Sequence, residues 1–151
     1  MLWKCLLYIW SIRQTLANCD HDISICDSKI KVSSVEKLLG VTISNTLRWD
    51  AHIDHHIKKC NFYLFLLSRI KVFLSRRNRI LFYNSYNLPH LDLCCIIWGN
   101  CSSTLGDKLV KFQKRAARVI VDCDFYTPSS ELFKELNWQT FPERVAYQKA
   151  F

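Results

Sequence analysis

The stretch that decides the fold is residues 35–53, VEKLLGVTISNTLRWDAHI, because it separates two kinds of pattern. Short alternating segments precede it, and long helical repeats follow it. Residues 37–43 combine β-branched side chains with Gly40, a residue able to bend a strand, and we interpret them as one buried strand. Polar turn residues follow, and Trp49 with Ile53 begins an apolar helical stripe.

The composition fits a folded unit with a core of its own. The chain has 151 residues, 50% of them hydrophobic, and only three Gly and three Pro. This composition argues against flexible linkers, low-complexity tracts and disorder. We predict the α+β class, with a small N-terminal antiparallel β element at residues 1–45 and a mainly α-helical bundle at residues 46–151.

Positive charge is concentrated in the middle of the chain. The formal net charge is +8, and residues 51–121 hold 12 Lys and Arg against 3 Asp and Glu. A basic block of this kind favours a polyanionic partner, most often nucleic acid. The alternative is a basic face that only keeps the protein solvated.

The eight cysteines do not form any Cys-x-x-Cys pair. Without that spacing or a convincing secretory signal, neither a zinc module nor a disulfide scaffold is favoured. We expect reduced thiols, several of them buried as small hydrophobic side chains, in a cytoplasmic or nuclear protein.

The N-terminal third has the alternation of short strands. We interpret residues 5–10 as a strand, and a short amphipathic helix through Ile12 and Leu16 is the competing interpretation. The segment is too short to cross a bilayer, for which about 20 apolar residues are needed, so we expect no membrane partner. Residues 23–33 predict a β-hairpin that turns at Asp27 and Ser28, with the strand at 37–43 beside it.

Helical spacing dominates the rest of the chain. A long helix is predicted over residues 50–71, with an apolar stripe made of Ile53, Ile57, Cys60, Leu64 and Leu67. A second helix is predicted over 76–86 and ends before Pro89. We interpret the apolar run at 90–98 as one fully buried helix. Thr127 and Pro128 predict the start of a short helix, and a final helix begins near Pro142.

Residues 103–121 have the clearest amphipathic pattern in the chain. Apolar residues share one face, namely Leu109, Phe112, Ala116 and Ile120. Cations share another face, namely Lys108, Lys111, Arg115 and Arg118, with Lys114 beside them. Few acids are near enough in sequence to pair with them, so we predict that this stripe binds phosphates, at about one power of salt concentration per contact. A solvated helix face is the alternative.

Many short blocks follow one another along nearly the entire chain. They are KLLGVTI at 37–43, WDAHI at 49–53, KKC at 58–60, LSRIK at 67–71, YNS at 83–85, LPHLDLC at 88–94, WG at 98–99, QKRAARVI at 113–120, TPS at 127–129, LF at 132–133, LNW at 136–138 and Arg144. In their order and spacing these blocks resemble the C-terminal part of the reverse transcriptases of Jockey-like non-LTR retrotransposons.

The resemblance implies a role for each part of the chain. Residues 37–41 correspond to the primer-grip hairpin at the end of the polymerase palm, which places Lys37 and Gly40 near nucleic acid. Residues 46–151 correspond to a thumb-like bundle and its C-terminal extension, in which the further cations expected at nucleic acid are Lys58, Lys59, Arg69 and Lys71. Lys4 resembles the lysine of the motif D strand, which assists the pyrophosphate leaving group in an intact enzyme.

A missing pair of carboxylates decides what this chain does alone. Polymerases of the family hold two metal ions with palm carboxylates that include an adjacent Asp-Asp pair. This chain has no Asp-Asp. We therefore expect no catalytic residue, metal or cofactor here, and Mg²⁺ only in the intact polymerase. The resemblance implies a truncated RNA-directed DNA polymerase that binds an RNA–DNA hybrid or duplex without sequence preference.

Other interpretations compete with this one. His52, His56 and Cys60 have the i,i+4 spacing that metal ligands use, but a lone helical cluster favours capping and surface roles. We assign the tryptophans and most phenylalanines to the core. The whole chain is alternatively a small basic helical module for an acidic protein. An uncovered palm edge also predicts self-association.

Overall fold

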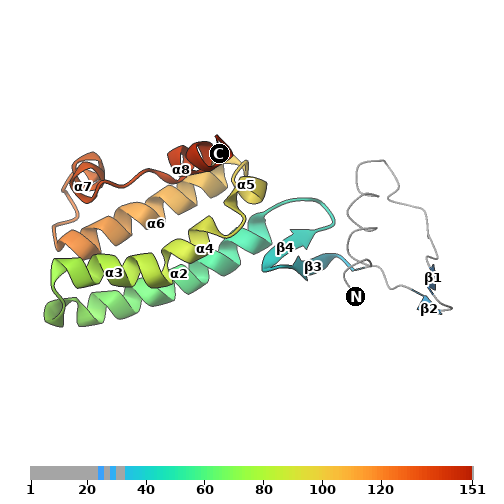
Figure 1. The fold of residues 1–151 in the computed structure, drawn as a ribbon, viewed down its shortest axis with the longest axis horizontal. Coiled ribbons are helices and arrows are strands. Elements are labelled where there is room, and N and C mark those ends of the chain that lie inside the picture. Colours follow the sequence, from blue (N-terminus) through green and yellow to red (C-terminus); the bar gives the residue numbers. More distant parts are fainter. Residues whose placement is uncertain (1–23, 26–27, 30–32, 151) are drawn as a thin grey trace. The chain divides into compact units, whose positions relative to one another are not determined.

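The structure is a computed structural model that describes residues 24–25, 28–29 and 33–150. Short strands come first and helices follow, which confirms the predicted α+β class (Figure 1). The chain divides into two compact units, Met1–His52 and Ile53–Phe151, and each is described by itself. The expected strand at 5–10, its helical alternative and Lys4 lie outside the described residues.

The first hairpin pairs β1 (Ser24–Ile25) with β2 (Ser28–Lys29) in antiparallel register. This confirms the hairpin predicted at residues 23–33, but the predicted turn is wrong. Ser28 is a strand residue opposite Ile25 and is therefore not a turn residue. Among the described residues this sheet has two strands and is separate from the next one, so the expected strand at 37–43 does not pair beside it.

The second hairpin corrects the interpretation of residues 37–43 as one buried strand. β3 (Val35–Leu38) and β4 (Val41–Ser44) are antiparallel, and Leu38 faces Val41 across a two-residue turn. Leu39 and Gly40 both have positive φ, 48° and 87°, as a primed hairpin turn requires, and Gly40 reverses the chain rather than bending it. Only Val41 is buried in the two strands.

The helices begin with α2 (Asp50–Ile70), which confirms the long helix predicted at 50–71 and continues into a short 3₁₀ helix, η2 (Lys71–Phe73). Next come α3 (Arg76–Tyr86), α4 (Leu88–Asp92), α5 (Cys95–Trp98), α6 (Ser103–Val121), α7 (Ser129–Leu136) and α8 (Phe141–Lys149). The predicted helices at 76–86, at 103–121 and near Pro142 are confirmed.

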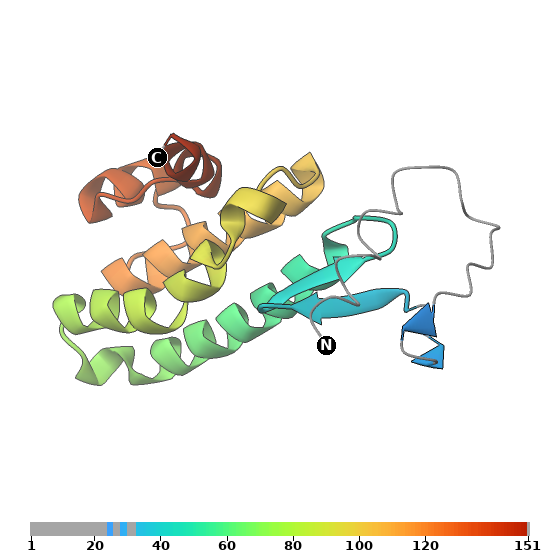
Figure 2. The same ribbon diagram turned by 45° about the vertical axis from the view of Figure 1, so that its right-hand side comes forward.

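The helices of the unit Ile53–Phe151 form layers. α3 lies between α2 and α6 and runs opposite to both, and α7 and α8 cover the other side of α6 (Figures 1 and 2). α6 is central because its apolar face is buried along its full length, through Leu105, Leu109, Phe112, Ala116, Ala117 and Ile120. This burial leaves the opposite face of α6 to polar side chains.

Two further expectations are corrected in this unit. The run at 90–98 is not one buried helix, because Cys94 adopts a left-handed conformation that ends α4 and starts α5. Ile96 and Ile97 are 50% and 58% exposed. Thr127 is not the cap of α7, which begins one residue later with Pro128 at the N-cap position.

Candidate nucleic-acid interface

α6 carries most of the predicted cation stripe on its polar face. Lys111 and Arg115 are exposed, and Lys114 is half-buried. Within the described ranges, none of the three forms an ion pair. Like charges three or four residues apart on a helix repel one another, so an anion that lies across them relieves this repulsion. We name these three residues, together with Arg118, the α6 patch.

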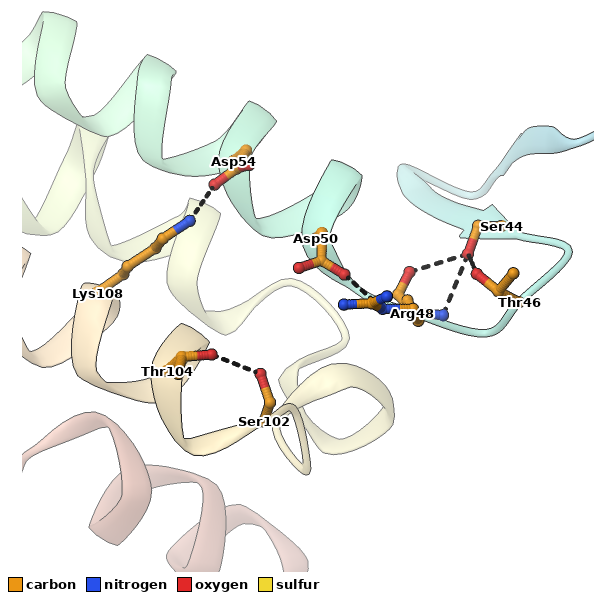
Figure 3. Close-up of polar contacts among 8 residues, drawn as sticks. All are labelled: Ser44, Thr46, Arg48, Asp50, Asp54, Ser102, Thr104 and Lys108. Atoms are coloured by element: carbon orange, nitrogen blue, oxygen red, sulfur yellow. Dashed lines mark hydrogen bonds and ion pairs between the residues drawn. The ribbon is translucent and has the colours of Figure 1, made fainter.

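The two ends of the predicted stripe are already engaged within the protein. Lys108 Nζ lies 3.1 Å from Asp54 Oδ1 and joins α6 to α2, so an acid far away in sequence already pairs with this residue (Figure 3). Arg118 places its guanidinium over the ring of Phe125, 5.1 Å from the ring centroid. Its Nε is buried and has no hydrogen-bond partner among the described residues.

α2 presents a second set of predicted cations. Lys58 and Lys59 are exposed, and neither has an ion pair among the residues that the structure describes. Arg69 is also exposed and lies over Phe65, with 5.1 Å between guanidinium carbon and ring centroid. Lys58, Phe62, Phe65 and Arg69 follow one another at helical spacing, so two exposed aromatic rings lie between two cations on this face.

Lys71 forms an ion pair within the fold and is not a free cation at the surface. Its Nζ lies 2.5 Å from Asp122 Oδ1, and the Arg79 guanidinium approaches the other carboxylate oxygen at 3.6 Å. The hydrogen bond from Lys71, its charge and the charge of Arg79 lower the pKa of Asp122. Together with the Asp54–Lys108 pair, this contact holds α2 and α6 parallel at both ends.

Lys37 and Gly40 belong to the hairpin in the unit Met1–His52. Lys37 is an exposed residue of β3 opposite Thr42, and Gly40 is in the turn. After β4, the Ser44 hydroxyl donates to the carbonyl of Arg48 at 3.0 Å and accepts from its backbone N–H at 3.1 Å (Figure 3). This closes the loop that leads to α2. The structure thus divides the predicted site residues between two units.

The described residues do not provide a metal centre. They contain no group of three His, Cys, Asp or Glu side chains able to hold an ion. Nδ1 of His52 accepts a backbone hydrogen bond, and His56 packs against the His90 ring at 5.4 Å. Burial raises the pKa of Cys60 to about 12, so it is a neutral thiol and a poor ligand.

Sequence reasoning missed the arginines of α3. Arg76 pairs with Glu135, and Arg77 is exposed. Arg79 is mostly buried and donates to the carbonyls of Lys71, Leu74 and Ile120. The sequence did contain a signal, because Arg76, Arg77 and Arg79 stand at the start of a predicted helix. The helix dipole disfavours cations at that end unless other groups of the protein bind them.

The assignment of most phenylalanines to the core is also wrong. Of the eight described, only Phe112, Phe133 and Phe141 are buried, whereas Phe62, Phe65, Phe73 and Phe125 are 53% to 87% exposed. The helical spacing of α2 indicated that Phe62 and Phe65 are exposed, because both positions lie outside the apolar stripe of Cys60, Leu64 and Leu67. Trp98 is buried as expected.

In the part of the chain that the structure describes, no helix is long and apolar enough to cross a membrane.

Two curated proteins are similar to this chain. A probable RNA-directed DNA polymerase from transposon BS of Drosophila melanogaster is 26% identical over 117 residues, which are 75% of this chain and 13% of that protein. A probable RNA-directed DNA polymerase from transposon X-element of the same organism is 27% identical over 114 residues, 72% of this chain and 12% of that protein. No family model and no solved structure matches. Over about three quarters of its length, this chain is therefore related in sequence to a region of transposon RNA-directed DNA polymerases.

Proposed function

We propose that the chain is a fragment of a non-LTR retrotransposon reverse transcriptase, comprising the primer-grip hairpin and the thumb without the catalytic palm. Its residual role is sequence-independent binding of template-primer nucleic acid, either an RNA–DNA hybrid or a duplex. The similarity to two transposon polymerases supports the origin. The α6 patch supports the role.

The observation that carries this proposal is the contrast between the two faces of α6. One face is buried throughout, and the other presents Lys111, Lys114 and Arg115 with no acid paired to them in the described part of the chain. A helix that only needed to stay solvated would be served by mixed charges, as on α8. Clustered cations of one sign instead match the phosphates of a nucleic acid backbone, which carry no sequence information.

Salt dependence of binding tests the proposal. We expect the chain to bind an RNA–DNA hybrid at about 50 mM salt and to lose affinity steeply by about 200 mM, with little difference between sequences. The double variant Lys111→Ala/Arg115→Ala should reduce the slope of log affinity against log salt by about 2, because each phosphate contact contributes about 0.9.

A matched control removes the same charge elsewhere. Lys134→Ala/Lys149→Ala changes one cation on α7 and one on α8, and it should leave the slope unchanged. If both double variants reduced the slope equally, binding would reflect general charge attraction rather than an interface on α6. Absence of binding by the unaltered chain at low salt would reject the proposal and favour the alternative, a basic helical module for an acidic protein.

Polymerisation by the isolated chain is not part of the proposal. No adjacent Asp-Asp is present to hold two metal ions. Primer extension with Mg²⁺ should give no incorporation, and incorporation by the pure chain would contradict the assignment to thumb and primer grip.

Self-association is a second proposal, and the hairpin supports it. β3 and β4 form a two-stranded sheet in the described residues, so each strand has an edge that another strand can pair with. Leu39 at the turn is 80% exposed, and Val35 is 46% exposed. Sedimentation should show a concentration-dependent dimer or larger species that Val35→Lys weakens, and a monomer at all concentrations would reject this proposal.

A further inference from the structure

Two exposed aromatic rings lie just beyond the C-terminal end of α6. Phe125 is 75% exposed and Tyr126 is 92% exposed. They are the central residues of a turn that is closed by the hydrogen bond from the Thr127 N–H to the Asp124 carbonyl, 3.2 Å long. A turn held in this way keeps both rings at the surface, where they lack the burial that usually stabilises aromatic side chains.

The turn is physically joined to the α6 patch. The guanidinium of Arg118 lies over one ring, 5.1 Å from the Phe125 centroid. Arg118 is one helical turn from both Lys114 and Arg115, so it links the other cations of the α6 patch to the aromatic turn. The patch from Lys111 to Arg118 is about 10 Å long at 1.5 Å per residue.

The two rings are oriented to receive separate bases. Their planes meet at 84°, with 6.0 Å between centroids, so one flat base cannot stack on both rings and each ring can take a base of its own. Bases inside a duplex are already stacked on their neighbours and leave no face free. Bases of a single strand can turn out and stack on aromatic side chains.

Acidic groups around the turn define where the phosphates lie. Lys71 and Arg79 neutralise Asp122. Asp124 is exposed and has no ion pair in the described ranges, so it repels phosphates at the tip of the turn. The phosphates are therefore expected along Lys111, Lys114 and Arg115, with the bases directed toward the rings.

From these contacts we infer that the Phe125–Tyr126 turn and the α6 patch form one binding site for single-stranded nucleic acid, in which unpaired bases stack on the two rings. This inference rests on the function proposed above and deepens it, because it distinguishes an unpaired strand from the duplex as ligand. The aromatic turn supplies the preference for unpaired bases, and the cations supply the salt-dependent part of the affinity.

The test compares two ligands that carry the same phosphates. A single strand of about 12 nucleotides and an abasic strand of equal length differ only in their bases, and a duplex closed at both ends offers no unpaired base. The chain should bind the base-bearing strand about 5- to 100-fold more tightly than the abasic strand. Phe125→Ala/Tyr126→Ala should abolish this difference and leave binding to the abasic strand and the closed duplex unchanged.

Controls separate the possible outcomes. Phe73→Ala removes another exposed ring, 87% exposed, and should keep the preference. Tyr126→Ala alone should lower the preference for the base-bearing strand, and this single variant serves as the test if the double variant melts earlier. Asp124→Asn should tighten binding of both strands. Equal, salt-dependent binding of both strands would overturn this inference and leave the proposed function standing, whereas no binding of either strand or the duplex at low salt would reject both.

Discussion

The backbone N–H of Thr42 donates a hydrogen bond to Nδ1 of His52, with 3.2 Å between the two nitrogens. The imidazole is fully buried, and its ring meets Trp49 edge to face at 6.4 Å. Because Nδ1 accepts, the ring proton is on Nε2, and the ring is neutral in this contact. The bond ties β4 to the first turn of α2, which gives the histidine of the WDAHI block a structural role.

Removing this acceptor should loosen the hairpin. His52→Leu leaves the half-buried Thr42 N–H without this partner, at a cost of about 1 kcal/mol. We expect amide hydrogen exchange at Thr42 to accelerate about tenfold or more. His52→Asn is the matched variant, because Oδ1 takes the place of Nδ1 and should retain part of the protection. Unchanged exchange in the leucine variant would show that the hydrogen bond contributes nothing.

Acid should weaken the contact between η2 and the end of α6. The hydrogen bond and charge of Lys71 lower the pKa of Asp122 from its ordinary value of 3.8 in the folded state. A carboxylate of this kind stabilises the fold fully above pH 3.8, and its contribution is lost as pH falls through the lower folded-state pKa. Asp122→Asn should therefore melt earlier than the unaltered chain at neutral pH, and the difference should shrink in acid.

Two features make that comparison clean. Asp122 has φ of 63°, a conformation that asparagine also tolerates, so the substitution keeps the end of α6. Asp107→Asn removes an exposed carboxylate of the same helix that lacks an ion pair in the described residues, and should change melting little at any pH. A difference for Asp122→Asn that persists undiminished below pH 3 would contradict the assignment.

The sequence predicted elements well where polar and apolar residues interleave. α6 was predicted to the residue, because its cations and apolar side chains recur with a clear helical period. The run at 90–98 offered no such contrast, so periodicity could not show that Cys94 breaks the backbone. The residue pattern missed the turn at Leu39 and Gly40 because leucine gives no turn signal, whereas the structure shows positive φ at both residues.

The sequence predicted which cations share the candidate site, but not which residues these cations contact. Helical spacing alone placed Lys111, Lys114 and Arg115 together on one face. It could not show that Lys71 is held by Asp122, because these residues are 51 positions apart and meet only through tertiary packing. The Phe125–Tyr126 turn also lies outside any period, so its contact with Arg118 required the structure.

Burial should protect Cys60 from thiol reagents. The side chain is fully buried between α2 and the start of α4, its Sγ lies 3.8 Å from the Asn87 carbonyl, and burial raises its pKa to about 12. Since the thiolate is the reactive form, maleimide at pH 8 should leave Cys60 unmodified in the native protein and modify it in denaturant. Among the cysteines that the structure describes, the half-buried Cys94 and Cys123 should react before Cys60. Peptide mass spectrometry measures each site, and rapid native labelling of Cys60 would show that α2 and α4 separate readily.

The glycines Gly99 and Gly106 should respond in opposite directions to alanine. A Cβ on Gly99 would lie 2.3 Å from the Cys95 carbonyl oxygen and 2.7 Å from both methyl carbons of Val145. The backbone at the end of α5 would have to shift, and α8 would have to move away from it. We expect Gly99→Ala to destabilise the fold by about 1–3 kcal/mol through overpacking.

Gly106 is the internal control, since a Cβ there meets nothing within 4 Å and the residue lies inside α6. Gly106→Ala should stabilise the fold by about 0.5–1 kcal/mol, because alanine has the higher helix propensity. Urea unfolding of both variants measures the two changes. Equal stability of Gly99→Ala and the unaltered chain would mean that the Cys95 carbonyl and Val145 do not approach Gly99 as closely as the structure places them.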